Sequence, residues 1–327
     1  MRFLILAGLR LWFAVSVFVG LSFQAQSEEF DVWRGTLRTE ALANGVSAAL
    51  FDEAFQNVSP IARVIELDRN QPEFTLTLST YLQKVVSGTR AKKARIRLEE
   101  HKDILAEVSA KYDVQPRFIV ALWGIETNFG QHTGGFSVIA ALATLAHDGR
   151  RSAYFRKELL NALTILQEGH IKPADMKGSW AGAMGQSQFM PSSFLSYATD
   201  WDGDGRRDIW TTQNDVFASI ANYLSSVGWR NDLTWGREVK VPVGLNVASL
   251  SQAKTKKTVD EWRALGVTSA DGSPLPKRNL TSRLVVPAKS DGRAFLAYKN
   301  YDNILKWNRS NYFAIAVGTL ADNIAYQ

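Results

Sequence analysis

Residues 122–130 read Leu-Trp-Gly-Ile-Glu-Thr-Asn-Phe-Gly and close an apolar run that begins just after Pro116. Proline suits the first turn of a helix, because its missing N–H would be unpaired there. At helical period Ile119, Leu122 and Glu126 share one face, so the sequence predicts a helix that places a carboxyl group beside core side chains. Gly130 then ends the helix.

A carboxyl group on an apolar helix face loses water, which disfavours its charged form and raises its pKa. Proteins use such groups to give a proton to a leaving group near neutral pH. The alternative is that Glu126 is a helix-end carboxylate paired with Arg or Lys, and this segment alone leaves both interpretations open.

The start of the chain predicts export. Arg2 and Arg10 form a charged beginning, residues 11–23 are largely apolar, and residues 25–27 (Ala-Gln-Ser) are small enough for cleavage, so residues 1–27 have the pattern of a secretory signal. The apolar run is shorter than the ~20 residues of a membrane span. An uncleaved anchor is the second interpretation.

The composition of the 327-residue chain excludes several classes of protein. It contains no Cys, so it has neither a disulfide framework nor a thiol to carry a lipid after the signal. Loss of residues 1–27 removes two Arg and no acidic residue, which lowers the formal charge from +6 to +4. This modest excess suits a place near anionic polymers, and without a basic stripe interleaved with aromatics we expect no nucleic-acid binding.

Residues 178–194 combine Gly and Ala, which allow close backbone approach, with the hydroxyl of Ser179 and the amides of Gln186 and Gln188. Neutral polar groups interleaved with aromatic rings suit a sugar. A tightly packed turn between helices has the same composition. Nearby, Arg150 and Arg151 either clamp an anionic substrate group or form a solvated pair at a helix start.

Residues 200–208, Asp-Trp-Asp-Gly-Asp-Gly-Arg-Arg-Asp, match the opening of a calcium loop, with acidic residues at positions 1, 3 and 5 and Gly at position 6. Position 12 departs from the pattern, because Thr211 replaces the bidentate Glu. An enlarged loop can close on a later carboxylate; the alternative is an Asp/Gly-rich surface turn. The predicted ligands are Asp200, Asp202, Asp204, the carbonyl of Arg206, and Asp215.

Together these motifs resemble the lytic murein transglycosylases of the membrane-bound transglycosylase B family (glycoside hydrolase family 103). The resemblance covers nearly the whole mature chain and rests on several motifs in one order, at residues 123–130, 141–145, 149–151, 178–194, 200–208, 221–223 and 307–310.

The resemblance implies a mainly α fold: a lysozyme-like helical core with an N-terminal helical region, an EF-hand-like loop insertion and a small β-containing region. Short strand-like runs at residues 238–243, 282–286 and 294–298 agree with the last of these. We expect a signal peptide (1–27), an N-terminal helical region (28–107), a catalytic core (108–235) with the calcium loop (200–215), a small α/β insertion (236–298) and a C-terminal helix that rejoins the core (299–327).

The resemblance also implies a function. The family cleaves the β-1,4 bond between N-acetylmuramic acid (MurNAc) and N-acetylglucosamine (GlcNAc) in peptidoglycan without water, and leaves a 1,6-anhydro ring on the muramic acid. Its single catalytic Glu matches Glu126. Matches to its saccharide site are Ser179, Gln188, Tyr223 and Asn308, with weaker matches at Tyr81, Arg150, Arg151 and Tyr312.

The implied setting is the periplasm, with glycan strands as the partner, no cofactor for the chemistry and calcium as a structural ion. The sequence identifies no partner in cell-wall synthesis or division complexes. We expect a soluble protein, because the chain has no Cys for a lipid anchor.

The chemistry agrees with a lone acid. Ordinary glycosidases need two carboxylates, whereas the motif around Glu126 offers one. No second carboxylate is needed if the C6 hydroxyl of the sugar attacks C1, with Glu126 first as acid and then as base. Ser179 would then bind the N-acetyl group and Asn308 a reacting hydroxyl. The alternatives are a hydrolytic muramidase that cleaves the same bond and a non-catalytic peptidoglycan-binding scaffold.

Overall fold

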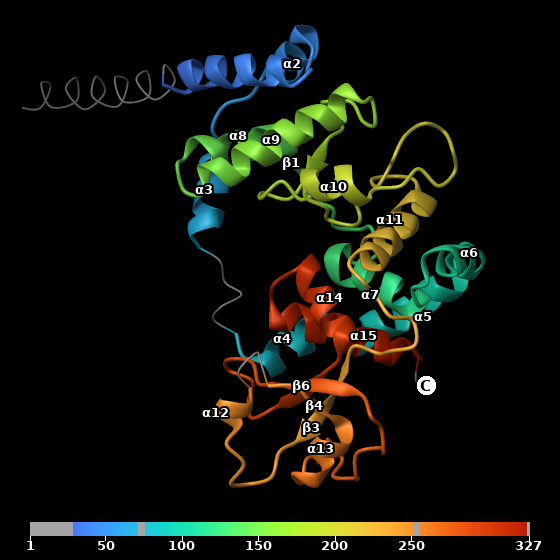
Figure 1. Cartoon of the computed structure of the whole chain (residues 1–327). Coiled ribbons are helices and arrows are strands. Elements are labelled where there is room, and N and C mark those ends of the chain that lie inside the picture. Colours follow the sequence, from blue (N-terminus) through green and yellow to red (C-terminus); the bar gives the residue numbers. More distant parts are fainter. Residues whose placement is uncertain (1–28, 71–75, 252–254, 326–327) are drawn as a thin grey trace, which may run out of the picture. The chain divides into compact units, whose positions relative to one another are not determined.

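The computed structural model describes residues 29–70, 76–251 and 255–325 (Figure 1). The predicted signal of residues 1–27 lies outside the described residues. The chain divides into two compact units. Of the described residues, the first unit contains 29–69, 135–183 and 190–192, and the second contains 70, 76–134, 184–189, 193–251 and 255–325.

Within the described residues, the first unit contains helices and one short antiparallel pair of strands. Its helix α8 is a run of small and aliphatic side chains, and residues 138–146 are all buried, as expected of a helix that is apolar on every side. The Ser137 side chain accepts the N–H of Ala140 and caps this helix. The elements are the helical residues 29–43, α2 (Ala48–Ala54), α3 (Ala62–Arg69), β1 (Phe136–Ser137), α8 (Val138–His147), α9 (Ser152–Gln167) and β2 (Lys177–Gly178).

The second unit holds the predicted central helix. This helix, α7, begins at Pro116 and ends at Thr127, and its residues 118–124 are buried. The chain leaves it through Asn128, whose φ of 52° is left-handed. The described helices of this unit outside its β-containing region are α4 (Leu78–Val85), α5 (Gly88–Glu100), α6 (Lys102–Tyr112), α7 (Pro116–Thr127), α11 (Gln213–Ser226), α14 (Lys299–Trp307) and α15 (Asn311–Ala325), while α10 (Pro191–Tyr197) has residues in both units.

A five-stranded antiparallel sheet in the second unit has the order β4-β6-β7-β3-β5. Its core contains Trp262, Leu284 and Leu296, all fully buried. The predicted strands at 238–243, 282–286 and 294–298 correspond to three of these five. The elements are β3 (Gly236–Lys240), α12 (Val247–Leu250), β4 (Lys257–Thr258), α13 (Val259–Ala264), β5 (Thr268–Ser269), β6 (Thr281–Val285) and β7 (Ala294–Ala297).

The mainly α fold class, with its N-terminal helices, inserted acidic loop and small β-containing region, is confirmed. The domain boundaries drawn from the sequence stay a prediction. Among the described residues, no helix combines the length and the apolar character that a bilayer span requires.

Candidate functional site

Glu126 lies in the last turn of α7 and is half-buried. The indole Nε1–H of Trp307, the last residue of α14, donates a hydrogen bond to Glu126 Oε1 across 2.7 Å. The Glu126 carboxyl group is therefore hydrogen-bonded to a second helix, α14, instead of extending into solvent.

Aromatic rings from different segments pack against Trp307, the donor of this hydrogen bond, and against one another. The centroid of the Trp307 ring lies 5.1 Å from that of Phe189 and 4.6 Å from that of Tyr223, and the Tyr197 and Tyr223 centroids are 4.6 Å apart. Burial raises the pKa of Tyr223 to about 12, so its phenol is a protonated hydrogen-bond donor at neutral pH. We call Phe189, Tyr197, Tyr223 and Trp307 the aromatic cluster.

A buried amide joins the end of α7 to the acidic loop. Gln186 Oε1 accepts the indole N–H of Trp123 at 2.8 Å, and its Nε2 donates to the carbonyl of Trp210 at 3.0 Å. The hydroxyl of Thr127 donates to the backbone carbonyl of Gln186 at 3.0 Å. The residue next to Glu126 is thus tied to the segment that precedes α11.

Gln188 holds a turn with the donors of its side chain. Its φ of 51° is left-handed, and its Nε2 donates to the carbonyls of Thr133 at 3.0 Å and Gly185 at 2.9 Å. Both amide hydrogens therefore bind backbone, and the acceptor Oε1 is the part of this side chain that can bind a sugar hydroxyl.

Asn308 directly follows Trp307 and ends α14 in an extended conformation. It is exposed, and its Oδ1 accepts the N–H of Ser310 at 3.0 Å. The amide nitrogen remains as the donor that a substrate hydroxyl can meet.

Tyr81 and Tyr312 form a pair of their own, with ring centroids 5.4 Å apart. The Tyr312 hydroxyl donates to the carbonyl of Ala288 at 2.7 Å, which fixes the start of α15 to the connection between β6 and β7. Burial raises the pKa of Tyr312. This contact gives Tyr312 a structural role, and the substrate role of both tyrosines stays a prediction.

Ser179, Arg150 and Arg151 belong to the first unit. The Ser179 Oγ accepts the N–H groups of Ala181 at 3.3 Å and Ala183 at 3.0 Å, so it shapes the turn after β2. Its hydroxyl hydrogen can still donate, which is what an N-acetyl carbonyl requires.

Both arginines bind one internal carboxylate. Arg150 contacts Asp68 through Nε and Nη2, and Arg151 contacts it through Nη2. The Asp68 side chain is 1% exposed, whereas those of Arg150 and Arg151 are 51% and 46% exposed. The sequence allowed either a clamp for a substrate anion or a solvated pair. The structure shows that the two arginines bind an anion, but this anion is the Asp68 carboxylate of the same chain.

The hydrogen bonds from Arg150, and then those from Arg151, hold the pKa of Asp68 below its usual value. Asp68→Asn is expected to lower the free energy of unfolding by about 2 kcal/mol at pH 7, because hydrogen bonds to a charged group are lost. Urea denaturation measures this effect. A carboxyl group with a lowered native pKa stabilises above its unfolded pKa of about 3.9, and the effect is lost as pH falls through the native pKa.

The difference between wild type and Asp68→Asn should therefore shrink in acid. Asp148→Asn is the matched control, because Asp148 pairs with the exposed Arg69 at 2.9 Å. This substitution should lower the free energy of unfolding by less than about 1 kcal/mol. Equal effects of the two variants, or a pH-independent difference, would contradict the proposed role of Asp68.

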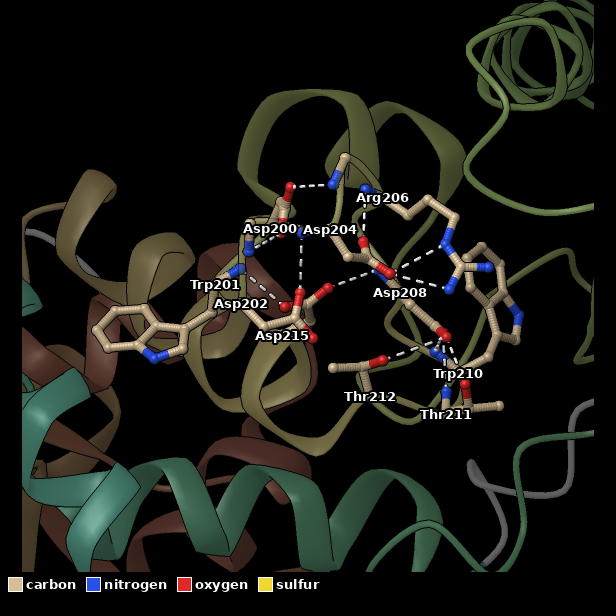
Figure 2. Close-up of polar contacts among 12 residues, drawn as sticks. Asp200, Trp201, Asp202, Asp204, Arg206, Asp208, Trp210, Thr211, Thr212 and Asp215 are labelled. Atoms are coloured by element: carbon tan, nitrogen blue, oxygen red, sulfur yellow. Dashed lines mark hydrogen bonds and ion pairs between the residues drawn. The ribbon is translucent and has the colours of Figure 1, made fainter.

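The acidic loop brings together three of its four predicted carboxylate ligands, and Asp215 is not part of this cluster. One carboxylate oxygen from each of Asp200, Asp202 and Asp204 lies within 4.8 Å of the others. Figure 2 shows the polar contacts that fold the loop, including hydrogen bonds to Asp200 from the N–H groups of Gly203 at 2.7 Å and Gly205 at 2.9 Å. The spacing read from the sequence thus brings three carboxylates to one place.

Asp215 closes the loop from α11. It is fully buried and accepts the N–H groups of Trp201 at 2.8 Å and Asp208 at 2.7 Å. The pKa of Asp215 is raised to about 6, mainly by burial and to a smaller extent by the charges of Asp202 and Asp200. The two hydrogen bonds from the backbone oppose this shift. Converging carboxylates that repel one another fit a hard cation with oxygen ligands. The Arg206 side chain meets Asp204 at 2.9 Å, while its carbonyl is the predicted ligand.

The structure brings together Glu126, Trp307 and Tyr223, with Asn308 adjacent in the chain and Gln188 next to Phe189 of the aromatic cluster. The sequence analysis assigned no role to Trp307 and read Gln186 only as an amide suited to sugar, so it missed two contacts here. Trp307 lies 181 residues from Glu126, and Gln186 lies 63 residues from Trp123. Trp307 did stand in a quoted motif, but the partner of an indole N–H cannot be identified from one sequence.

Comparison with known proteins places these features in context. Residues 29–322 match the family model described as the transglycosylase SLT domain. The chain is 32% identical over 247 residues to the membrane-bound lytic murein transglycosylase B of Escherichia coli K12, an alignment that covers 75% of this chain and 66%, just under two thirds, of that protein.

Two solved proteins share the fold. SltB3 from Pseudomonas aeruginosa, in complex with NAG-NAM-pentapeptide, matches with a TM-score of 0.87 and 45% identity over 91% of this chain and 80% of that one. The same protein is also known in complex with NAG-anhNAM-pentapeptide (TM-score 0.86, 45% identity, 90% and 79% coverage). The lytic transglycosylase Slt35 of Escherichia coli, in complex with calcium, matches with a TM-score of 0.76 and 28% identity over 89% of this chain and 92% of that one.

Proposed function

The chain belongs to the transglycosylase SLT domain family, and from this premise we propose that it is a peptidoglycan lytic transglycosylase. It cleaves the β-1,4 bond between MurNAc and GlcNAc and leaves a 1,6-anhydroMurNAc end. One observation carries the proposal: a half-buried Glu126, held by an indole N–H among aromatic rings, in a chain 45% identical to a protein crystallised with an anhydro-sugar ligand.

Glu126 acts first as an acid. Its carboxyl proton passes to the glycosidic oxygen, the bond from that oxygen to C1 of MurNAc breaks, and GlcNAc leaves with a hydroxyl group. An oxocarbenium-like centre remains at C1, and the neighbouring N-acetyl group steadies it.

Glu126 then acts as a base. The C6 hydroxyl of the same sugar attacks C1, its proton returns to the carboxylate, and the new bond between C1 and O6 closes the anhydro ring. Atoms and charges balance without water. The aromatic cluster supports this course, because a site lined by rings excludes the water that hydrolysis would consume.

Four polar side chains are proposed to bind the saccharide. Tyr223 of the aromatic cluster offers a protonated phenol, and Asn308 offers an amide N–H next to Trp307. Gln188 offers its acceptor oxygen, and Ser179 offers its hydroxyl hydrogen to the N-acetyl group. Tyr81, Tyr312, Arg150 and Arg151 are weaker candidates, because Tyr312 and both arginines already hold internal partners.

The acidic loop is proposed to bind a structural calcium ion through Asp200, Asp202, Asp204, the carbonyl of Arg206 and Asp215. The three clustered carboxylates and the buried Asp215 support it, as does the calcium complex of Slt35. The ion would neutralise the converging charges and hold the loop closed. The chemistry itself needs no cofactor.

We propose that the protein is exported by its N-terminal signal and acts in the periplasm on glycan strands. The apolar segment of residues 11–23 and the charged residues that precede it support export.

Digestion of purified sacculi tests the activity. We expect soluble muropeptides whose mass is lower by one water than that of hydrolytic products. Products carrying the additional water would indicate a muramidase. Binding to sacculi without release of muropeptides would indicate a scaffold protein, and either result would refute the proposed reaction.

A further inference from the structure

The β6–β7 connection, residues 286–293, contacts the start of α4, a helix of the same unit that lies far earlier in the chain. We propose that this connection is a positioning element for substrate binding: the Lys289 carbonyl and the Asp291 carboxylate hold the first turn of α4 and so place Tyr81 of that helix against the glycan. The inference rests on the proposed function. It adds a role for the β-containing region, which supplies no group to the proposed chemistry.

The first three N–H groups of α4 all have acceptors. The N–H of Leu78 binds the Lys289 carbonyl at 3.0 Å, and the N–H of Ser79 binds Asp291 Oδ2 at 3.1 Å. The third, from Thr80, binds the hydroxyl of the N-cap residue at 3.3 Å. Such groups have no partner within the helix itself. Two of the three acceptors belong to the β6–β7 connection, so contacts between distant segments help to define where this helix begins.

The negative charge of Asp291 suits the N-terminal end of a helix. Hydrogen bonds from the side chains of Ser79 and Thr77, and then from the Ser79 N–H, hold the pKa of Asp291 below its ordinary value, so the group is a carboxylate at neutral pH. The helix dipole favours a carboxylate at this end. Helix α4 has only eight residues and no acidic residue in its own first turn, and a helix this short is marginal by itself. Asp291 therefore supplies a charge that the helix lacks.

The backbone of the connection is fixed in an uncommon conformation. Lys289 and Asp291 have φ values of 53° and 54°, and Ser290 between them is buried. Residues other than Gly keep such left-handed angles where surrounding contacts hold them, often near ligands. At the other end, Arg293 donates two hydrogen bonds of 2.7 Å to Glu238 of β3. The connection is thus anchored to the sheet on one side and to α4 on the other.

A second link joins the connection to Tyr81 through Tyr312. The Tyr312 hydroxyl, which donates to Ala288, also lies 3.2 Å from the Lys289 carbonyl. It is 3.3 Å from the carbonyl of Leu76, two residues before α4. The rings of Tyr312 and Tyr81 pack with centroids 5.4 Å apart, and Tyr81 is partly exposed. A phenol ring with an apolar body and a polar tip suits a sugar. Loss of the contacts from the connection would therefore move a ring that the glycan meets.

Two changes at position 291 test the proposal. Asp291→Gly removes the carboxylate and tolerates the left-handed φ, and Asp291→Asn tolerates it as well but keeps an acceptor oxygen. For both, kcat and KM for anhydro-product formation are measured with a defined GlcNAc-MurNAc oligomer. Titration calorimetry measures the Kd of the same oligomer for each variant combined with Glu126→Gln.

We expect Asp291→Gly to raise KM and Kd about three- to tenfold, the effect of one misplaced aromatic contact, while kcat stays within about twofold. The change acts on a binding element and leaves the reacting groups in place. Asp291→Asn should stay within about twofold of wild type, because its amide oxygen can accept the Ser79 N–H. A residue that only stabilises the fold would not separate KM from kcat in this way.

Asp271 provides the matched control. Like Asp291, it is an exposed aspartate that precedes a glycine in the β-containing region. Its carboxylate accepts the N–H of Ser273 at 2.9 Å and its hydroxyl at 2.7 Å, within its own turn. Asp271→Gly should leave KM and Kd at their wild-type values. Thermal melting of both glycine variants shows that they remain folded.

Tyr81→Ala shows whether position 291 acts through Tyr81. By itself this variant should raise KM at least as much as Asp291→Gly does. The double variant should raise KM no further than Tyr81→Ala, because both changes remove the same contact with the glycan and effects that share one contact do not add.

The outcomes separate this inference from the proposed function. Unchanged KM and Kd in Asp291→Gly or in Tyr81→Ala refute the positioning role, and so does an effect of Asp291→Gly that adds in full to that of Tyr81→Ala. A lower kcat and melting temperature at unchanged KM would give the connection a merely structural role and also refute it. In each of these cases anhydro products from the wild type leave the function in place. If the wild type forms none, the function fails, and the Kd values still decide the role of the connection.

Discussion

Glu126→Gln is expected to reduce the formation of 1,6-anhydro products from purified sacculi by about 10³- to 10⁴-fold, the upper range for loss of a general acid. The amide oxygen of glutamine can still accept the indole N–H of Trp307, so the side chain should keep its place. What it loses is a proton that can be transferred and later regained. Mass spectrometry of the released sugar ends measures the effect, and thermal melting shows that the variant remains folded.

Glu158→Gln is the matched control for this variant. Glu158 is 3% exposed and lies in the first unit, where it accepts the N–H of Ser192 at 2.8 Å and its hydroxyl at 2.7 Å. The same chemical change there should reduce stability and leave kcat within about twofold of wild type, because no charge is removed from the reacting group. Retained activity in folded Glu126→Gln would remove Glu126 from the mechanism.

Asp202→Ala is expected to lower the melting temperature by about 5–10 °C in the presence of calcium. An ion at 100 times its dissociation constant stabilises by about 2.7 kcal/mol, and about 2–4 °C per kcal/mol applies to proteins of roughly this size. A chelator should cause a similar fall in the wild type and no further fall in the variant. Differential scanning calorimetry measures both effects, and the folded variant should keep its product.

Asp271→Ala controls for the loss of an acidic turn residue. Asp271 is exposed and accepts both the N–H of Ser273 at 2.9 Å and its hydroxyl at 2.7 Å, in a turn of the β-containing region. This variant should keep the full response of the melting temperature to calcium. A wild-type melting temperature that ignores both calcium and chelator would show that the acidic loop binds no structural ion.

The features that the sequence predicts well are local. The helix α7 follows from Pro116 and the spacing of a few apolar residues, and it begins where expected. The acidic loop can be predicted because its carboxylates lie within one short segment. This segment folds back on itself through contacts such as the hydrogen bond from the Gly205 N–H to Asp200. In both cases the partners are near in sequence, so spacing determines geometry.

The features that the sequence could not reveal are contacts between distant segments. From the sequence, Arg150 and Arg151 are either a clamp for a substrate anion or a solvated pair at a helix start. The anion that they hold is Asp68, 82 and 83 residues earlier in the chain. In the same way, no periodicity connects Trp307 to Glu126. A single sequence shows which groups can donate and accept, whereas the fold decides which of them meet.

The amide of Gln186 has a further consequence for how this chain can diverge. It must accept from Trp123 and donate to Trp210 at once, so glutamate would lack the donor, asparagine would be too short, and methionine would supply neither. A side chain at position 130 would displace this amide, because its Cβ would lie against Gln186 Oε1, and the φ of 77° at Gly130 would strain any other residue. A substitution at either position without a compensating change at the other is therefore expected to destabilise the fold. The two positions are expected to co-vary.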